Sequence, residues 1–384
     1  MTKDLKNYKL HEKKIISSYD RFSLSNSQYN EIKKDFKKSK TMIIGAAGSI
    51  GKEFTFRMMD FDFRELYLMD KDENQLTDLN RELVRDHRKK IKKINFICAD
   101  LNIFNLDQFF IKNKISHYLN FAAVKHVRSE ENLHSIHYML MTNSKNFLPK
   151  TAKINNLKKI FSISTDKAVH PSSLLGVSKK IMEEKLYEIK KKNSKLFVST
   201  TRFANVSFSN GSILKLIIDN LISKKDFGIP LNINRFFITH KEASSLCLKS
   251  LLKECDGHII VPKHHILGKG KSIYDLCIKI IKNLKLKFKI IGKKIHMNNF
   301  FIYLEKRKIV GQKSFELLYE KNESISFLEK DNSVYKIKLK NNINLKKIFK
   351  IEKFKSISEI KNFFKKNISS YKPLKSNLKI SKNI

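Results

Sequence analysis

The chain has 384 residues, of which 41% are apolar and 10% aromatic, so it can bury a large core and is not expected to be disordered. Its 78 Lys and Arg against 37 Asp and Glu give a formal charge of +41, but the lysines are spread along the whole chain. Because the excess does not gather into one patch, no specific nucleic acid partner is expected, only weak adhesion to polyanions and salt-sensitive stability.

Residues 1–40 alternate polar and apolar side chains at roughly helical spacing, which predicts an N-terminal extension of one or two helices packed outside the main domain. The first residues are charged and contain no apolar stretch typical of a signal peptide. The apolar runs elsewhere are interrupted by lysine and too short to span a bilayer. We therefore expect a cytoplasmic protein without a transmembrane segment.

Between residues 41 and 206, short apolar runs alternate with amphipathic helical segments. This alternation is typical of right-handed βαβ units, which place their strands in one parallel sheet with helices on both faces. The pattern predicts an α/β fold in which residues 41–206 form a Rossmann-like domain with a doubly wound parallel sheet.

The regular alternation weakens after Asn205. Residues 207–268 contain two helical segments and a short extended stretch, RFFITH, and are predicted to form a smaller α/β lobe that caps the substrate. Residues 269–384 are rich in lysine and asparagine and contain only short apolar strands. We interpret them as a divergent C-terminal region, parts of which could return to the lobe.

The cysteines and histidines do not form a metal-binding pattern. His134 and His137 have no carboxylate or second ligand cluster nearby in the sequence, so we expect no metal site. The four cysteines show no CxxC spacing and lie within apolar runs, which predicts buried free thiols rather than disulfides at Cys98, Cys247, Cys255 and Cys277.

The first predicted strand runs into the glycine-rich stretch GAAGSIG, residues 45–51, and then into a helix. Glycines at such a turn let the backbone approach a pyrophosphate, while the helix N-terminus directs N–H groups at the phosphates. Asp70 ends the next predicted strand about 20 residues later, where a carboxylate can bind the adenosine ribose. The pattern predicts a dinucleotide site that includes Gly45, Gly48, Ser49, Ile50, Gly51 and Asp70.

Three further residues bear on the cofactor. Asp70 favours NAD, because its carboxylate would repel the 2′-phosphate of NADP, although the neighbouring Lys71 leaves NADP open. Asp100 ends the third strand and has two interpretations, a contact with the adenine amine or the N-cap of the next helix. Ala122 ends the fourth strand, where a small residue lets the chain pass beneath a cofactor, although packing alone could also explain it.

Several motifs occur together in one order, GAAGSIG, NFAAVKHV, STDKAVHPSSLLGVSK, RFANVSFSNGS and RFFITHKEA. In combination they resemble the extended short-chain dehydrogenase/reductases of polysaccharide biosynthesis. Within that superfamily the chain resembles the CapD-like nucleotide-sugar 4,6-dehydratases that act on UDP-N-acetylglucosamine, over about residues 40–265. The resemblance implies a UDP-sugar substrate, NAD as cofactor and a homo-oligomer.

The resemblance also implies an internal redox cycle. A hydride leaves C4 of the sugar, water is lost across C5 and C6, and the hydride returns to C6. In this cycle Thr165 would hydrogen-bond the C4 oxygen, Asp166 would protonate the departing C6 hydroxyl, and Lys167 would act as base at C5. Lys179 would bind the nicotinamide ribose. A purely structural alternative is that Asp166 caps a turn and that Lys167 and Lys179 are solvated.

Leu175 occupies the position at which many short-chain dehydrogenases carry a tyrosine that removes the C4 hydroxyl proton. Leucine has no proton to exchange, so another group must act, with Asp166, or Lys179 through water, as the candidates. The larger membrane-anchored dehydratases that this chain resembles carry methionine there, and leucine is close to methionine in volume and polarity. We therefore interpret the site as a variant active site and not as one that has lost its activity.

The resemblance assigns three residues to the substrate. Lys125 would lie near the sugar, although a surface role is nearly as well supported in so lysine-rich a chain. Asn205 would bind the substrate, and Arg235 the diphosphate, since a guanidinium fork suits phosphate oxygens.

Two other functions stay open at this stage. A nucleotide-sugar epimerase would use the same cofactor, but the missing tyrosine and the Asp166-Lys167 pair count against it. A noncatalytic protein that binds NAD or a nucleotide sugar is favoured by Leu175 and by the divergent C-terminal region.

Overall fold

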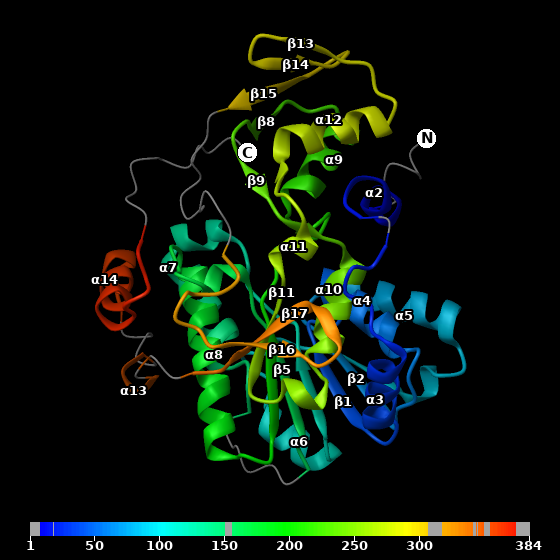
Figure 1. Cartoon of the computed structure of the whole chain (residues 1–384), viewed down its shortest axis with the longest axis vertical. Helices are drawn as coiled ribbons and strands as arrows, with labels where there is room; N and C mark the ends of the chain where they lie inside the picture. The colour runs from blue at the N-terminus through cyan, green and yellow to red at the C-terminus, as the bar shows by residue number, and fades with distance from the viewer. Residues whose placement is uncertain are drawn as a thin grey trace.

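The computed structural model describes residues 8–17, 19–149, 156–305, 317–340, 343, 345–348 and 354–373. Within these residues the largest element is a nine-stranded sheet of order β16-β17-β11-β6-β5-β4-β1-β2-β3 (Figure 1). Neighbours from β3 across to β11 pair in parallel, whereas β17 and β16 are antiparallel additions at one edge. The strands are β1 (Lys40–Ile44), β2 (Glu65–Asp70), β3 (Ile94–Cys98), β4 (His117–Asn120), β5 (Lys159–Ile163), β6 (Phe197–Thr201), β11 (His258–Pro262), β16 (Ile325–Leu328) and β17 (Asp331–Lys338).

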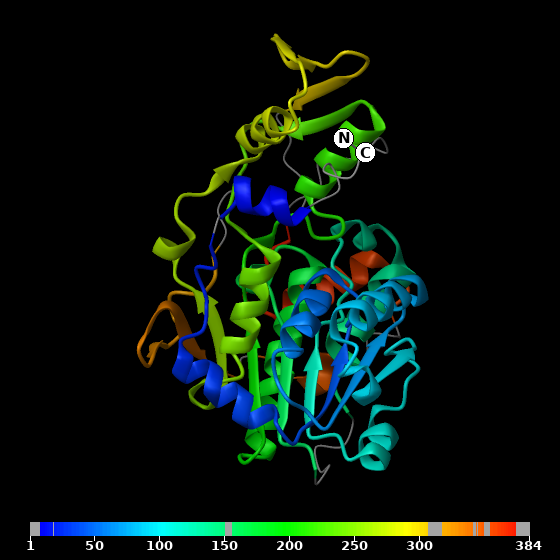
Figure 2. The ribbon, with the colours of Figure 1, turned by 90° about the vertical axis from the view of Figure 1, so that its right-hand side faces the viewer.

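Helices cover both faces of this sheet (Figures 1 and 2). On one face α4 packs against α10, and on the other α7 packs against α8. None of the described helices is both long and apolar enough to cross a membrane. The helices of this main body are α3 (Asn26–Phe36), α4 (Ser49–Met58), α5 (Glu73–His87), α6 (Leu106–Asn113), α7 (Leu133–Leu140), α8 (Leu174–Lys192), α10 (His240–Lys249), α13 (Leu345–Ile348) and α14 (Ile357–Asn367), with short turns η1 (Ile91–Lys93), η2 (Val127–Glu131), η3 (Met141–Lys145), η4 (Asp166–Ala168) and η5 (Lys253–Cys255).

The order of the parallel strands reverses between β1 and β4, and this reversal creates a crevice at the carboxyl edge of the sheet. β1 pairs with β2 on one side and with β4 on the other, so the chain leaves β1 and β4 in opposite directions. In open α/β sheets, ligands bind at such a switch point. The predicted Rossmann-like, doubly wound parallel sheet is confirmed.

A smaller α/β lobe stands above the carboxyl edge (Figure 1). Its own apolar core, distinct from that of the main body, is formed by residues of α2, α9 and α12 and of a four-stranded sheet of order β13-β14-β15-β8. Two short strand pairs, β7 with β10 and β9 with β12, lie between the lobe and the main body. The bounds are α2 (Tyr8–Ile15), α9 (Ile213–Ser223), α11 (His264–Leu267), α12 (Ile273–Asn283), β7 (Asn205–Val206), β8 (Phe227–Pro230), β9 (Asn234–Arg235), β10 (Phe237–Ile238), β12 (Lys271–Ser272), β13 (Lys289–Ile291), β14 (Lys294–His296) and β15 (Phe301–Glu305).

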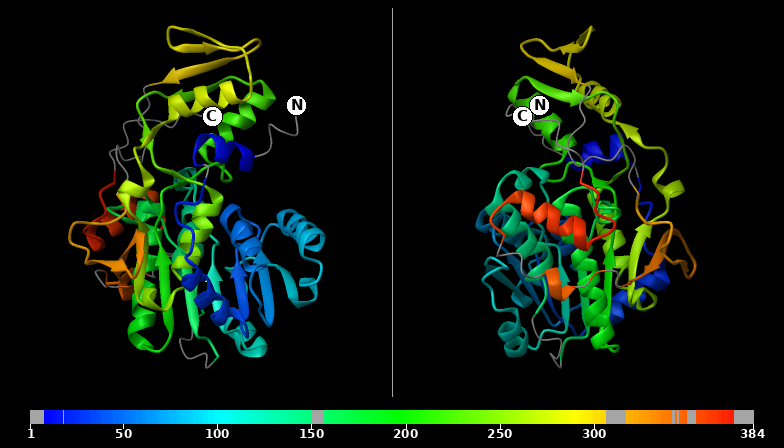
Figure 3. Two further views of the ribbon diagram at one scale, coloured as in Figure 1. Left: turned by 45° about the vertical axis from the view of Figure 1, so that its right-hand side comes forward. Right: turned by 90° about the vertical axis from the view of Figure 1, so that its left-hand side faces the viewer.

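The lobe does not coincide with the expected segment 207–268. Within that segment α10 packs on α4 and β11 pairs with β6, so residues 240–262 belong to the main body. The C-terminal region expected from residue 269 divides between both parts. α12 and β13 to β15 complete the lobe, β16 and β17 extend the main sheet, and α13 and α14 lie outside α7 and α8 (Figure 3).

The N-terminal extension joins the two parts. Of its expected helices, α3 packs on the core of the main body through Ile32 and Phe36, while α2 packs on the core of the lobe. Between them, Arg21 donates from Nε and Nη2 to the two carboxylate oxygens of Glu242 on α10, at 2.5 and 2.9 Å. Residues 1–7 lie outside the described residues.

The prediction of buried thiols is right for three cysteines and wrong for one. Cys247, Cys255 and Cys277 are buried, and burial raises the pKa of each thiol. Cys98 is exposed, because it ends β3, the strand at the edge of the sheet.

Candidate active site

The glycine-rich turn after β1 approaches the end of β4 so closely that a side chain is excluded. Gly45 has φ of 72°, and a Cβ on it would lie 2.6 Å from the backbone nitrogen of Ala122. α4 begins four residues later at Ser49, so the N–H groups of its first turn are directed toward this edge. A bare backbone at a helix N-terminus is the cradle that a pyrophosphate requires.

A single cavity of about 580 Å³ extends from this turn to the lobe. Its volume lies in the range of small-molecule sites. Asp166, alone among the predicted catalytic and binding residues, is not part of its wall. The predicted site residues that do line it are Gly45, Gly48, Ser49, Ile50, Gly51, Asp70, Asp100, Ala122, Lys125, Thr165, Lys167, Lys179, Asn205 and Arg235.

At one end of the cavity, Asp70 and Asp100 are held by neighbouring hydrogen-bond donors. Asp70 Oδ2 accepts from the backbone N–H of Ala47 at 3.0 Å, which fixes the carboxylate against the glycine-rich turn. Asp100 Oδ2 accepts from the hydroxyl of Tyr138 at 2.6 Å, and that hydroxyl also accepts from Lys71 Nζ at 3.2 Å. Although burial opposes ionisation, the bond from Tyr138 holds the pKa of Asp100 below its usual range.

The helix-cap interpretation of Asp100 is wrong. The residue that caps α6 is Asn105, whose side chain accepts from the N–H of Gln108. Asp100 instead accepts from the N–H of Asn102 at 2.8 Å and closes the turn directly after β3. Tyr138, which the sequence analysis missed, comes from α7 and completes this wall of the cavity.

At the other end, Thr165, Asp166 and Lys167 form one hydrogen-bonded group after β5. Asp166 Oδ1 accepts from the Thr165 hydroxyl at 2.7 Å and from Lys167 Nζ at 3.3 Å. The turn η4 is capped by Thr165 and not by the carboxylate of Asp166. Asp166 is only 5% exposed and lies behind the wall that Thr165 and Lys167 form. The Asp166 carboxylate therefore contacts the cavity only indirectly, through its hydrogen bonds with Thr165 and Lys167.

α8 approaches this group through a glycine. A Cβ on Gly176 would lie 2.3 Å from the carbonyl oxygen of Lys167, so only glycine permits this contact. The preceding residue, Leu175, lines the cavity, and its N–H donates to Glu130 Oε1 at 3.0 Å. Burial raises the pKa of Glu130, against the effect of this hydrogen bond. The tyrosine position is thus filled by an apolar side chain on a rigidly held helix start.

Lys179, one turn beyond Leu175, is 4% exposed and lines the cavity with its side chain. Its ammonium donates to the carbonyl oxygen of Ile163 at 2.8 Å. Burial lowers the pKa of Lys179 to about 8, and the nearby Glu183 opposes this effect only in part.

Asn143 holds the loop that follows β4 and was not singled out from the sequence. Its Oδ1 accepts from the N–H of Val124 at 2.9 Å, and its Nδ2 donates to the carbonyl of Val124 at 2.9 Å and to Ser178 Oγ at 3.0 Å. It lies in the π-helical turn η3, a local widening that often marks functional positions. Next to Val124, Lys125 is exposed to the cavity, where desolvation and then Lys167 lower its pKa.

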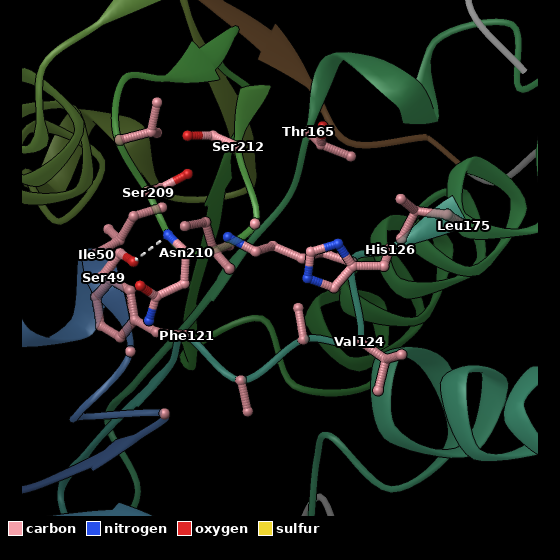
Figure 4. Close-up of a pocket in the computed structure, with 18 of the residues that line it drawn as sticks. Ser49, Ile50, Phe121, Val124, His126, Thr165, Leu175, Ser209, Asn210 and Ser212 are labelled. Carbon is pink, nitrogen blue, oxygen red and sulfur yellow. Dashed lines mark hydrogen bonds between the residues drawn. The ribbon is translucent and has the colours of Figure 1, made fainter. Parts of the chain in front are cut away.

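The loop after β7 crosses the cavity. The backbone N–H of Asn210 donates to Ser49 Oγ at 3.0 Å, and its side-chain amide donates to Gln75 Oε1 at 3.3 Å. Figure 4 shows this contact on one side, with His126, Thr165 and Leu175 on the other. The loop thus ties the lobe to the glycine-rich side of the main body.

The carboxylates of the cavity wall are confined to one end. Among the described lining residues they are Asp70 and Asp100, both at the glycine-rich end, where Lys71 also lines the wall. Toward the lobe the wall carries basic side chains, Lys125, His126, Lys167, Lys179 and Arg235. Such a cationic end suits an anionic ligand such as a diphosphate. No cluster of three or more metal-binding side chains occurs in the part of the chain that the structure describes.

Several curated proteins similar to this chain carry names that refer to polysaccharide biosynthesis or to UDP-glucose. The capsular polysaccharide biosynthesis protein CapD of Staphylococcus aureus is 30% identical over 251 residues, 64% of this chain and 41% of CapD. The UDP-glucose 4-epimerase of Rickettsia bellii is 28% identical over 234 residues, 58% of this chain and 66% of that enzyme. The chain thus spans less than half the length of CapD.

The fold is shared with solved structures. The X-ray structure of Pen from Bacillus thuringiensis matches with a TM-score of 0.65 at 20% identity, over 86% of this chain and 98% of Pen. A family model described as polysaccharide biosynthesis protein matches residues 41–344, from β1 through the lobe to the last strands of the sheet. Because these residues are well over half of the sequence, the chain belongs to this polysaccharide biosynthesis protein family.

Proposed function

We propose that this protein is an NAD-dependent nucleotide-sugar 4,6-dehydratase that converts UDP-N-acetylglucosamine into a UDP-4-keto-6-deoxy-hexosamine for surface polysaccharide synthesis. The observation that carries the proposal is the hydrogen-bonded group of Thr165, Asp166 and Lys167, of which Thr165 and Lys167 line the cavity together with the apolar Leu175. An acid and a base side by side suit elimination of water, whereas the proton-exchanging tyrosine of plain ketoreductases is missing.

The residues present fit NAD. The bare backbone at Gly45 would receive the pyrophosphate, and Asp70 the adenosine ribose, where a carboxylate disfavours a 2′-phosphate. Lys71, which could favour NADP, donates instead to the hydroxyl of Tyr138. Lys179 would hold the nicotinamide ribose. When bound, the nicotinamide would accept the hydride from C4 and return it to C6.

Side chains of the protein would donate and accept the protons of the reaction. The Thr165 hydroxyl would orient the C4 oxygen, and the Lys167 amine would remove the C5 proton once C4 is oxidised. Asp166 would receive the C4 hydroxyl proton through Thr165 and pass it to the departing C6 hydroxyl, and Lys167 would return its proton to C5 when the hydride reaches C6. Because Asp166 bonds both of the others through Oδ1, a proton can reach the cavity along either hydrogen bond without exposing the carboxylate to water.

The lobe end would bind the nucleotide sugar. Arg235 on β9 and Asn205 on β7 line the cavity beside the basic side chains described above. A guanidinium fork can bind two oxygens of a diphosphate, and Lys125 would contact the sugar. This arrangement supports a UDP-sugar substrate.

A nucleotide-sugar epimerase is the second candidate, because the Rickettsia bellii relative carries that name. An epimerase must also take the C4 proton, and Leu175 cannot do so. Simple inversion at C4 needs no base at C5 and no acid at C6, the roles proposed for Lys167 and Asp166.

The deciding experiment incubates the protein with UDP-N-acetylglucosamine and substoichiometric NAD and follows the nucleotide sugar by mass spectrometry and NMR. A product lighter by one water supports the dehydratase. A product of unchanged mass with inverted C4 supports the epimerase, and bound but unchanged substrate refutes both. Asp166→Asn should abolish water loss with NAD binding intact, while Asp107→Asn, half-buried in the first turn of α6 and outside the cavity wall, serves as the matched control.

A further inference from the structure

A fully buried arginine lies at the end of β6, three residues before Asn205. Arg202 is 0% exposed. Its Nε and Nη2 donate to the two carboxylate oxygens of Glu183, each at 2.7 Å. Its Nη1 and Nη2 donate to the two oxygens of Glu323, each at 2.9 Å, and Nη1 also donates to the carbonyl of Leu318 at 3.2 Å. All five N–H donors of the guanidinium are therefore used.

On one side this arginine is connected to the turn that carries Thr165, Asp166 and Lys167, here called the catalytic turn. Glu183 lies on α8, one turn beyond Lys179, and its Oε1 accepts from the Ser164 hydroxyl at 2.6 Å. Ser164 directly precedes Thr165, and Lys179 bonds the carbonyl of Ile163. α8 therefore holds the end of β5 at two successive residues, and Arg202 in turn holds Glu183.

On the other side the arginine is connected to the C-terminal region. Glu323 belongs to a segment that leads into β16, and its Oε2 also accepts from the N–H of Glu320 at 2.7 Å. Glu320 pairs with Lys180 on α8 at 3.4 Å, and both side chains are nearly buried. Burial would raise the pKa of Glu323, but the Arg202 guanidinium outweighs this and holds it below its usual range. Glu323 is thus a carboxylate anion in the interior.

We propose that Glu323 is a positioning residue of the active site. Through Arg202 and Glu183, it holds the ends of β5 and β6 in their working geometry. Thr165 follows β5, and Asn205 lies on β7, which follows β6. The inference rests on the proposed function, because it assigns Thr165 and Asn205 to chemistry and substrate.

The physical reason is the cost of an unpaired charge. Without Glu323, two N–H groups of the fully buried Arg202 would lose their acceptor, a strongly unfavourable state. The arginine would have to move toward another acceptor, and the ends of β5 and β6 would move with it. A displacement of about 1 Å at reacting groups can lower a rate roughly 100-fold.

The test compares Glu323→Gln with Asp331→Asn. Asp331 forms an ion pair with Lys249, and these side chains are 6% and 3% exposed. This pair also fastens the C-terminal region to the main body, but neither residue lines the cavity. Both substitutions remove one buried carboxylate charge from the same region, so we expect both to lower the melting temperature.

Only Glu323→Gln should disturb the site. Hydrogen exchange followed by mass spectrometry should show faster exchange in peptides covering residues 164–168 and 202–206 for this variant and not for Asp331→Asn. With UDP-N-acetylglucosamine and NAD, kcat should fall roughly 10- to 100-fold for Glu323→Gln and stay near the wild-type value for the control. Glu323→Asp, which keeps the charge, should recover part of kcat.

Equal exchange in those peptides and equal kcat for the two variants would refute the positioning role. If the wild-type protein shows no turnover, the proposed function fails, and the exchange comparison still decides whether Glu323 orders the strand ends. Should Glu323→Gln not fold, Glu320→Gln, which removes the pair with Lys180 from the same turn, is measured against the same control and by the same criterion.

Discussion

The buried ammonium of Lys179 makes a pH-dependent contribution to stability that can be measured directly. Burial lowers its pKa from 10.5 to about 8, a difference worth about 3 kcal/mol between the two protonation states. Lys179→Met keeps the length of the side chain and removes the charge. It also leaves the Ile163 carbonyl without its donor, at a cost of about 1 kcal/mol at any pH.

The direction in which stability changes with pH follows from whether the native or the unfolded state binds the proton. Below pH 8 the lysine is charged in both states, so the native protein carries the full cost of burying it. Between the native and unfolded pKa values the native state has lost the proton and the unfolded state keeps it, so the wild type gains stability relative to the variant as pH rises. We expect Lys179→Met to be more stable by about 2 kcal/mol at pH 7 and less stable than the wild type near pH 10.5.

The assay is urea denaturation of both proteins at several pH values from 7 to 10.5. Lys112→Met is the control, because this side chain is exposed and its ammonium meets solvent in both states. A free-energy difference between Lys179→Met and the wild type that stays constant across the pH range would refute the reasoning.

Three further results are expected. Gly176→Ala should lower activity at least roughly tenfold, since its Cβ would lie 2.3 Å from the Lys167 carbonyl and displace the catalytic turn; full activity with unchanged stability would contradict this contact. A thiol reagent should modify only Cys98 in the native protein and all four cysteines in urea, and protection of Cys98 would count against its exposed position. Because the formal charge is +41, added sodium chloride should raise the melting temperature by screening self-repulsion, and a flat salt profile would argue that the lysines are already paired.

Local sequence patterns were sufficient to predict the Rossmann-like part of the molecule. The glycine-rich turn, the acidic ends of β2 and β3 and the small residues after β4 are each set by short-range requirements of backbone and strand order. Because parallel strands end at one edge, these residues meet in one cavity whatever the loops between them do.

Features that depend on distant pairing could not be predicted in the same way. Residues 240–262 carry a helix and a strand that would suit the lobe equally well, and only pairing of β11 with β6 assigns them to the main sheet. The partner of Arg202 lies 121 positions away at Glu323, with no local signal in either segment. The burial of Asp166 likewise results from packing of α8 and not from its own neighbours.

The position of α14 limits how copies of this chain could assemble. Ile360 and Phe364 of α14 share one apolar cluster with Ile136 of α7 and Val177 of α8. That helix pair already has a covering helix from its own chain, so a second copy could use this face only by displacing α14 or by exchanging it between subunits. The expected homo-oligomer would therefore either use another face or form by reciprocal exchange of α14 between subunits. An oligomer that exchanges α14 would dissociate slowly on dilution.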